Sequence, residues 1–140
     1  MRFFFDNCIS VNLTEAMRLL TEPHHEIEHL TTRFSPDALD VEWIPVVAVD
    51  AGLILVSGDP AITTSKKEKE IWRQSGLTSF FFGGDFARLP IWSQVTEVVS
   101  WWPQIVLTAK DASRGNGYLL PLKGSKKGPK SIYTPSGDGE

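Results

Sequence analysis

Three short apolar runs constrain the fold of this chain more than any other feature. Residues 2–6, 53–57 and 77–82 have the length of β-strands but do not alternate between polar and apolar side chains. A strand with one face in water alternates, whereas a strand buried on both faces reads as a continuous apolar run. The pattern therefore predicts a sheet that is covered by helices on both sides.

Segments with helical spacing separate these strands. Apolar residues recur at helical intervals in residues 11–20, about 40–52, and 90–109, where Pro103 predicts a kink, and a charged helix is expected over 66–75. Residues 26–30 predict a weak strand near the sheet edge, and 118–122 a last strand. The order predicts an α/β fold, a three-layer αβα sandwich with a mainly parallel sheet of about five strands.

Composition indicates one domain in a reducing compartment. The 140 residues suffice for one buried core, which we place in residues 1–122, and the Gly, Ser, Lys and Pro-rich segment 123–140 is expected to be a mobile tail. Cys8 is the one cysteine, which excludes an intrachain disulfide and a cysteine-based zinc site. With no signal-peptide pattern and no membrane-length apolar run, we expect a cytoplasmic protein without a membrane partner.

Acidic residues gather at equivalent places in successive strand–loop–helix units. Asp6 and Asp59 follow predicted strands, and Asp40 with Glu42 opens the helix that leads into strand 53–57. The carboxyl ends of parallel strands share one sheet edge, so these acids could meet there. Close carboxylates repel one another unless a hard cation such as Mg²⁺ or Mn²⁺ neutralises them. We therefore predict that all four are catalytic and bind metal.

Simpler roles for the same acids stay open. Asp40 could merely cap its helix, and Asp59 before Pro60 is good turn chemistry. Glu42 lies about 200° around an ideal helix from Asp40, so the two cannot point alike if both are fully helical, and one could contact the metal directly while the other supports the site from behind.

Basic residues follow the last of these acids. Lys66, Lys67, Lys69 and Arg73 lie on the predicted helix 66–75, where a solvated helix surface is the alternative to phosphate binding. We assign Lys66, Lys67 and Arg73, together with Asn7 and Ser57 beside the strand-end acids, to substrate binding. The net charge of −3 argues against nucleic-acid binding through bulk positive charge.

Five motifs carry a family resemblance, namely Phe3-Phe4-Phe5-Asp6-Asn7, Asp40-Val41-Glu42-Trp43-Ile44-Pro45, Val56-Ser57-Gly58-Asp59, the strand 76–82, and Trp101-Trp102-Pro103. In order and spacing they resemble the PIN-like nucleases of the VapC-type toxin group. The resemblance implies a Mg²⁺- or Mn²⁺-dependent ribonuclease that is the toxin of a toxin–antitoxin pair, with an RNA substrate, a cognate antitoxin protein and frequent homodimerisation. The family's acids match Asp6, Asp40, Glu42 and Asp59.

The sequence departs from the family pattern at two positions. Many relatives carry a fourth acid where this chain has Ala61, and Cys8 replaces a small polar residue. Asp85, after strand 77–82, is the candidate substitute for the fourth acid, and whether the site takes one metal or two stays open.

Three other functions compete with the nuclease. A catalytically silent PIN-like module that binds a protein partner is the main alternative. A receiver-like phosphoacceptor domain needs adjacent acids after the first strand, and a haloacid-dehalogenase-type phosphatase needs Asp-x-Asp there. Asp6-Asn7-Cys8 supplies neither pattern.

Overall fold

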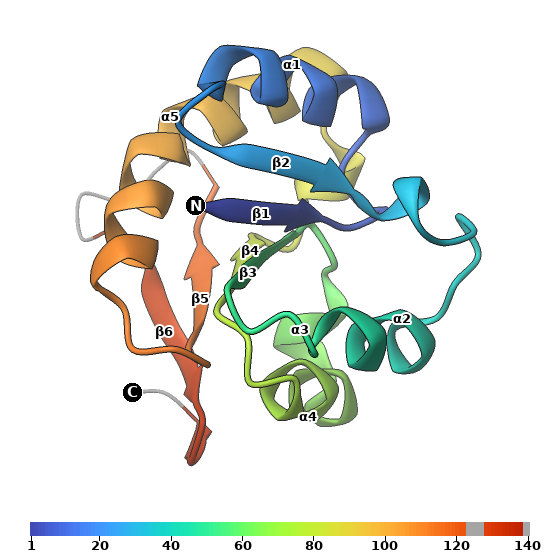
Figure 1. Cartoon of the computed structure of the whole chain (residues 1–140), viewed down its shortest axis with the longest axis vertical. Coiled ribbons are helices and arrows are strands. Elements are labelled where there is room, and N and C mark those ends of the chain that lie inside the picture. Colours follow the sequence, from blue (N-terminus) through green and yellow to red (C-terminus); the bar gives the residue numbers. More distant parts are fainter. Residues whose placement is uncertain (123–127, 139–140) are drawn as a thin grey trace.

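A single twisted sheet forms the middle layer of the molecule (Figure 1). The computed structural model describes residues 1–122 and 128–138. Its strands are β1 (Arg2–Phe5), β2 (Glu26–His29), β3 (Leu53–Ser57), β4 (Ser79–Phe82), β5 (Gly117–Leu120), β6 (Lys130–Thr134) and β7 (Gly137–Asp138). Its helices are α1 (Val11–Thr21), α2 (Asp40–Val47), α3 (Ala61–Thr64), α4 (Lys66–Gln74) and α5 (Ile91–Asp111), with short 3-10 turns η1 (Leu30–Thr32) and η2 (Phe86–Arg88).

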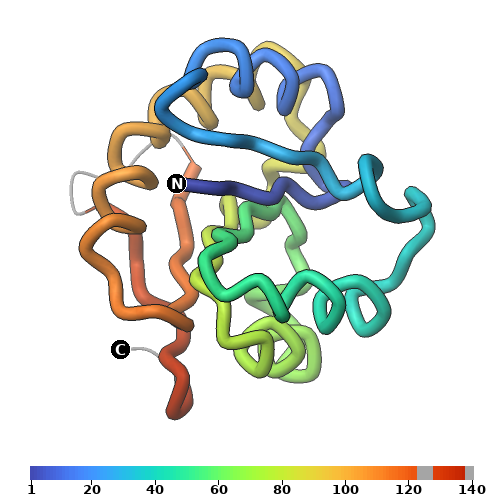
Figure 2. Tube along the Cα trace, viewed as in Figure 1, coloured from blue at the N-terminus to red at the C-terminus, as the bar shows by residue number. Residues whose placement is uncertain are grey.

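The sheet order is β2-β1-β3-β4-β5-β6-β7. Strands β1 to β5 pair in parallel, and β6 and β7 add antiparallel neighbours at one edge. The trace in Figure 2 shows β1, in dark blue, running between β2 and β3. The predicted α/β fold with a mainly parallel sheet is therefore confirmed, and β2 lies at the edge as its weak pattern predicted.

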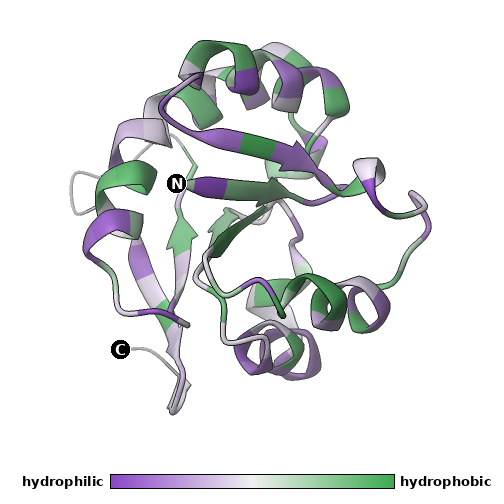
Figure 3. Cartoon of the chain, viewed as in Figure 1, coloured by the Kyte–Doolittle hydropathy of each residue, from purple (hydrophilic) through white to green (hydrophobic). Residues whose placement is uncertain are grey.

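Two apolar cores lie on the two faces of the sheet, and the strands alternate between them. Phe3 and Phe5 face the core under α1 and α5, whereas Phe4 faces the core under α2 and α4. The uninterrupted apolar runs thus reflect burial on both sides, and Figure 3 shows them as green strands in the middle layer. In the described part of the chain, no helix is long and apolar enough to cross a membrane.

Part of the segment that we expected to be a mobile tail is built into the sheet. Strand β6 pairs antiparallel with β5, and the side chain of Tyr133 is fully buried against it. Gly117 makes this possible, because a Cβ atom at that position would lie 2.1 Å from the Tyr133 ring. Residues 123–127 and 139–140 of the expected tail lie outside the described residues.

Candidate metal centre

The order in which strands are added to the sheet reverses between the parallel neighbours β1 and β3. After β1 the chain passes through α1 to β2 on one side, and after β3 it passes through α3 and α4 to β4 on the other. Two connections that leave in opposite directions open a crevice at the carboxyl ends of the two strands, where α/β proteins bind ligands. Asp6 follows β1 and Asp59 follows β3, so both acids stand at this crevice, as the sequence predicted.

Three carboxylates meet at the crevice. Ligand oxygens of Asp40, Asp59 and Glu68 all lie within 4.8 Å of one another. Asp40 comes from the first turn of α2, Asp59 from the loop after β3, and Glu68 from the first turn of α4. The fold therefore gathers acids from three separate segments into one group, which we call the acidic triad.

Hydrogen bonds hold two members of the triad in place. The buried Trp43 donates its indole N–H to Oδ1 of Asp40 over 3.0 Å, and its ring stacks on Phe4 with centroids 5.5 Å apart. Asp59 accepts the backbone N–H of Ala61 at Oδ1 over 2.9 Å. The expected turn role of Asp59 is thus compatible with its place in the triad. Asp40 does not cap α2, because Leu39 is the N-cap residue and Asp40 is the first residue of the helix.

Asp6 lies beside the triad, behind Ser57. Its side chain is 4% exposed, accepts the Ser57 hydroxyl at Oδ2, and accepts the backbone N–H of Cys8 at Oδ1 over 3.0 Å. The same Ser57 Oγ accepts the backbone N–H of Asp59 over 3.0 Å, so one hydroxyl connects the two strand ends. Burial raises the pKa of Asp6 to about 7 in spite of these hydrogen bonds, and the charges of Asp40 and Asp59 add to the rise.

Burial and mutual repulsion also act on the triad itself. The pKa of Glu68 is raised to about 7, first by desolvation and then by the nearby Asp40 and Asp59 carboxylates. The pKa of Asp59 is raised by desolvation and by Asp40. Oε2 of Glu68 is buried and has no hydrogen-bond partner in the described chain. A buried carboxylate oxygen without a donor is an unsatisfied acceptor, which a cation can satisfy.

The acidic triad fits a hard divalent cation. Mg²⁺ binds oxygen at about 2.0–2.1 Å, so two ligand oxygens on opposite sides of one ion lie about 4.2 Å apart, and larger ions allow more. The mutual distances of at most 4.8 Å between the triad oxygens are compatible with this geometry. All three donors are carboxylate oxygens, the ligand type that Mg²⁺ and Mn²⁺ prefer. The triad could therefore bind a metal ion of this class.

Besides Asp6, two further acids predicted from the sequence lie outside the triad. Glu42 uses Oε1 to accept the backbone N–H of Leu39 over 2.8 Å, which satisfies a free donor at the start of α2. This bond holds the Glu42 carboxylate at the N-terminus of α2. Asp85 is exposed just before η2 and is not among the grouped acids of the described residues.

Glu68 is the acid that sequence reasoning missed. The sequence assigns helix 66–75 to substrate binding through its basic residues or to a solvated surface, and its candidate for a further acid, in place of Ala61, is Asp85. One signal was present: Glu68 precedes the fully buried Trp72 by four residues, and residues four apart share a helix face. A glutamate on the buried face of a charged helix points inward, and here it points to the site.

The predicted substrate residues differ in their surroundings. Lys66 and Lys67 are exposed on the first turn of α4, and the charge of Lys67 acts on Glu68. Asn7 donates its side-chain amide to the Pro36 carbonyl over 2.9 Å, which connects the loop after β1 to the loop before α2. The two lysines therefore remain suited to a substrate role, whereas the visible role of Asn7 is structural.

Arg73 does not face the crevice. It lies in the last turn of α4, where it pairs with Glu70 and donates to the Pro135 carbonyl over 2.6 Å. Arg73 comes five residues after Glu68, so it lies about 7.5 Å further along the helix axis. Arg73 connects α4 to the turn between β6 and β7 instead.

Comparison with known protein families identifies the fold. A family model described as a PIN-like domain matches residues 1–84, which is more than half of the chain. This chain belongs to the PIN-like domain family. The matched region runs from β1 through β4 and contains Asp6 and all three triad acids. Searches of curated proteins and of solved structures find no match. The match is to the PIN-like domain as a whole, and membership of the VapC-type toxin group stays a prediction.

Proposed function

We propose that this PIN-like protein is a Mg²⁺- or Mn²⁺-dependent endoribonuclease. The observation that carries the proposal is the convergence of Asp40, Asp59 and Glu68 within 4.8 Å of one another at the carboxyl edge of the sheet. A divalent cation bound there would lower the pKa of a water molecule and stabilise negative charge on a phosphodiester. PIN-like domains are typically nucleases, which is consistent with this chemistry.

The chain's own residues divide the work between binding the cation and attracting the substrate. The triad offers one carboxylate oxygen from each member, and Asp6 adds a further carboxyl group, which Ser57 connects to the backbone of Asp59. Lys66 and Lys67 lie within one helical turn of Glu68. Their two positive charges are therefore close to the site that a phosphate backbone would approach. An RNA strand is the substrate that the motif resemblance supports.

We extend the proposal to the biological role on the motif resemblance alone. The order of the motifs supports a toxin whose activity is restrained by a cognate antitoxin protein in the cytoplasm. A catalytically silent PIN-like module that binds a protein partner is the alternative, and it predicts no metal-dependent cleavage.

Cleavage of RNA by the purified protein tests the proposal. We expect hydrolysis in millimolar Mn²⁺ or Mg²⁺, none in EDTA, and a loss of at least two orders of magnitude for Asp59→Asn and Glu68→Gln. The matched control is Glu70→Gln, an exposed glutamate on the same helix that pairs with Arg73. Equal cleavage by the starting protein and both site variants would place the activity elsewhere, and no cleavage by any of them would favour the silent module.

A further inference from the structure

A groove lies between α2 and α4, beside the acidic triad. Figure 1 shows both helices on the same side of the sheet, and the rings of Trp43 and Trp72 connect them edge to face with centroids 5.4 Å apart. The groove has a volume of about 430 Å³ and is lined mainly by uncharged side chains, namely Val41, Ile44, Pro45 and Ala48 of α2 and Ile71 and Gln74 of α4. This volume is within the range of clefts that bind small ring systems.

The groove begins one helical turn from the triad. Asp40 and Glu68 lie in the first turns of α2 and α4, so both helices start at the triad. Ile44 and Ala48 follow Asp40 at intervals of four residues. Ile71 follows Glu68 by three, and both intervals keep side chains on one helix face. Four residues advance about 6 Å along a helix axis. A ligand with a phosphate at the triad can therefore place its neighbouring group in the groove.

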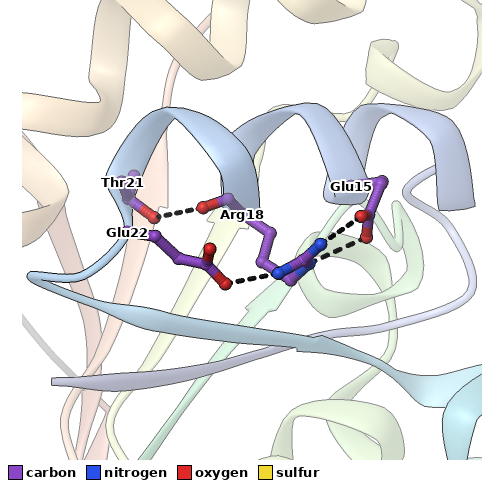
Figure 4. Close-up of polar contacts among 4 residues, drawn as sticks. All are labelled: Glu15, Arg18, Thr21 and Glu22. Atoms are coloured by element: carbon purple, nitrogen blue, oxygen red, sulfur yellow. Dashed lines mark hydrogen bonds and ion pairs between the residues drawn. The ribbon is translucent and has the colours of Figure 1, made fainter.

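The charges around the groove suit a polyanion whose phosphates stay outside it. The side chains that line the groove are uncharged, whereas Lys66 and Lys67 are exposed at the triad end of α4. Helix α1, on the other face of the sheet, offers no such route, because Arg18 is held by ion pairs to Glu15 and Glu22 (Figure 4). An RNA strand can therefore place its phosphates at the lysines and the triad, and a neutral base in the groove.

The lining of the groove matches a nucleobase. Proteins bind an unstacked base by packing side chains against its flat faces and hydrogen-bonding groups against its edge. Ile44, Pro45 and Ile71 supply aliphatic walls, and Gln74 supplies an amide. Nε2 of Gln74 donates to Oε1 of Glu70 over 3.2 Å, which orients this amide. An amide nitrogen carries two hydrogens, so Gln74 has a second N–H and a carbonyl oxygen to offer as a donor–acceptor pair.

Adenine is the base that pairs with such an amide. A glutamine side chain donates to N7 of adenine and accepts from its N6 amino group. This edge is accessible in an unpaired base of single-stranded RNA. We propose that the groove between α2 and α4 is a base subsite for an unpaired adenine next to the phosphate at the triad, with Gln74 as the residue that determines specificity. The inference rests on the proposed ribonuclease function and names its substrate class.

Binding of two labelled RNA hexanucleotides tests the proposal on the full chain. One probe has six uridines and the other has one adenosine among five uridines, and fluorescence anisotropy in EDTA measures their affinity without cleavage. We expect the adenosine probe to bind at least about fivefold more tightly, the effect of one bidentate contact. Gln74→Leu should remove this preference and leave the affinity for the uridine probe unchanged. Gln104→Leu, at an exposed glutamine on α5, is the matched control and should keep the preference.

A second variant tests the groove itself. Ala48→Leu adds volume to one wall, so it should lower the affinity for the adenosine probe to that for the uridine probe. Placing the adenosine in the stem of an RNA hairpin should also remove the preference, because a paired and stacked base cannot enter the groove. Circular dichroism and urea unfolding confirm that each variant is folded, which is expected because Gln74 is exposed and Ala48 is half-buried.

Two outcomes overturn the proposal. One is equal affinity of the starting protein for the two probes, or no binding of either, which is the result expected if the groove binds a protein partner instead. The other is an adenosine preference that neither Gln74→Leu nor Ala48→Leu changes.

Cleavage in Mn²⁺ separates this inference from the proposed function. We expect the starting protein to cut the adenosine probe at a bond next to the adenosine, as mapped by mass spectrometry of the products. An intact adenosine preference in EDTA without cleavage in Mn²⁺ would overturn the nuclease and keep the base subsite. Cleavage of both probes without any preference for adenosine would overturn the base subsite and keep the nuclease.

Discussion

Replacing Asp6 by Asn should stabilise the metal-free protein while abolishing its activity. Asp6 is buried with a pKa of about 7, against an ordinary value of 3.8, so the folded protein holds a proton there that the unfolded chain releases. Below pH 3.8 Asp6 is protonated in both the folded and the unfolded protein, so it does not lower the stability of the fold. Above pH 3.8 the unfolded chain releases the proton more readily, and stability is lost as the pH rises through 7. Ionised Asp6 therefore destabilises the fold at neutral and alkaline pH.

The magnitude follows from the two pKa values. Each pH unit between the two pKa values removes about 1.4 kcal/mol of stability, so the raised pKa of Asp6 costs the fold about 2 kcal/mol at pH 5 and about 4–5 kcal/mol at pH 8. Asn has the same shape and no charge to desolvate. Its amide oxygen can accept the Cys8 N–H, and its NH2 group can donate to Ser57 Oγ, which reverses the direction of that hydrogen bond. The advantage of Asp6→Asn in the free energy of unfolding should therefore grow by about 3 kcal/mol from pH 5 to pH 8.

Urea unfolding in EDTA at these two pH values measures the difference. Glu68 and Asp59 also have raised pKa values and add to the pH dependence of both proteins, so the difference between variant and starting protein isolates Asp6. Asp37→Asn, at an exposed acid in the loop before α2, is the matched control and should show no such trend. An Asp6→Asn variant that is less stable at pH 8, or whose advantage does not change with pH, would refute the reasoning.

Three further variants test other parts of the account. Lys66→Ala combined with Lys67→Ala should weaken RNA binding and lower the slope of log affinity against log salt by about 1.4, measured by fluorescence anisotropy at several salt concentrations. Trp43→Phe removes the indole donor to Asp40 and should weaken Mn²⁺ binding by about 10- to 100-fold, measured by calorimetry, with an unchanged fold. Gly117→Ala should destabilise the fold by about 1–3 kcal/mol in urea unfolding, because the added methyl group overlaps a ring of β6.

For each of these variants, one outcome would contradict the prediction. Lys110→Ala, at the far end of α5 from the crevice, is the control for the lysine pair and should bind RNA normally. An unchanged salt slope in the double variant would move the substrate path away from α4. Full Mn²⁺ affinity in Trp43→Phe would mean that Asp40 does not need the indole hydrogen bond to bind metal. A Gly117→Ala variant as stable as the starting protein would mean that β6 can detach from β5 with no change in the free energy of unfolding.

The sequence predicted the sheet edge well because strand ends and buried strands leave clear patterns. The apolar run at 53–57 matches β3 over its whole length, and Asp59 follows it directly. Glu42 could not be placed from the sequence, because a glutamate three residues after the N-cap residue can either cap the helix or point to a site, and only the backbone geometry decides. Strand β6 was missed because its few apolar residues sit in a segment whose composition is typical of a tail.

The central claim is that the acidic triad binds one divalent cation, and a Mn²⁺ titration tests it most directly. Free Mn²⁺ is measured by electron paramagnetic resonance as it is added to the starting protein, Glu68→Gln and the control Glu70→Gln at pH 7.5. The account predicts saturable binding to the starting protein and to the control, and an affinity at least tenfold weaker for Glu68→Gln, whose Oε2 is the unsatisfied buried acceptor. Absence of saturable binding, or equal affinity in all three proteins, would contradict it.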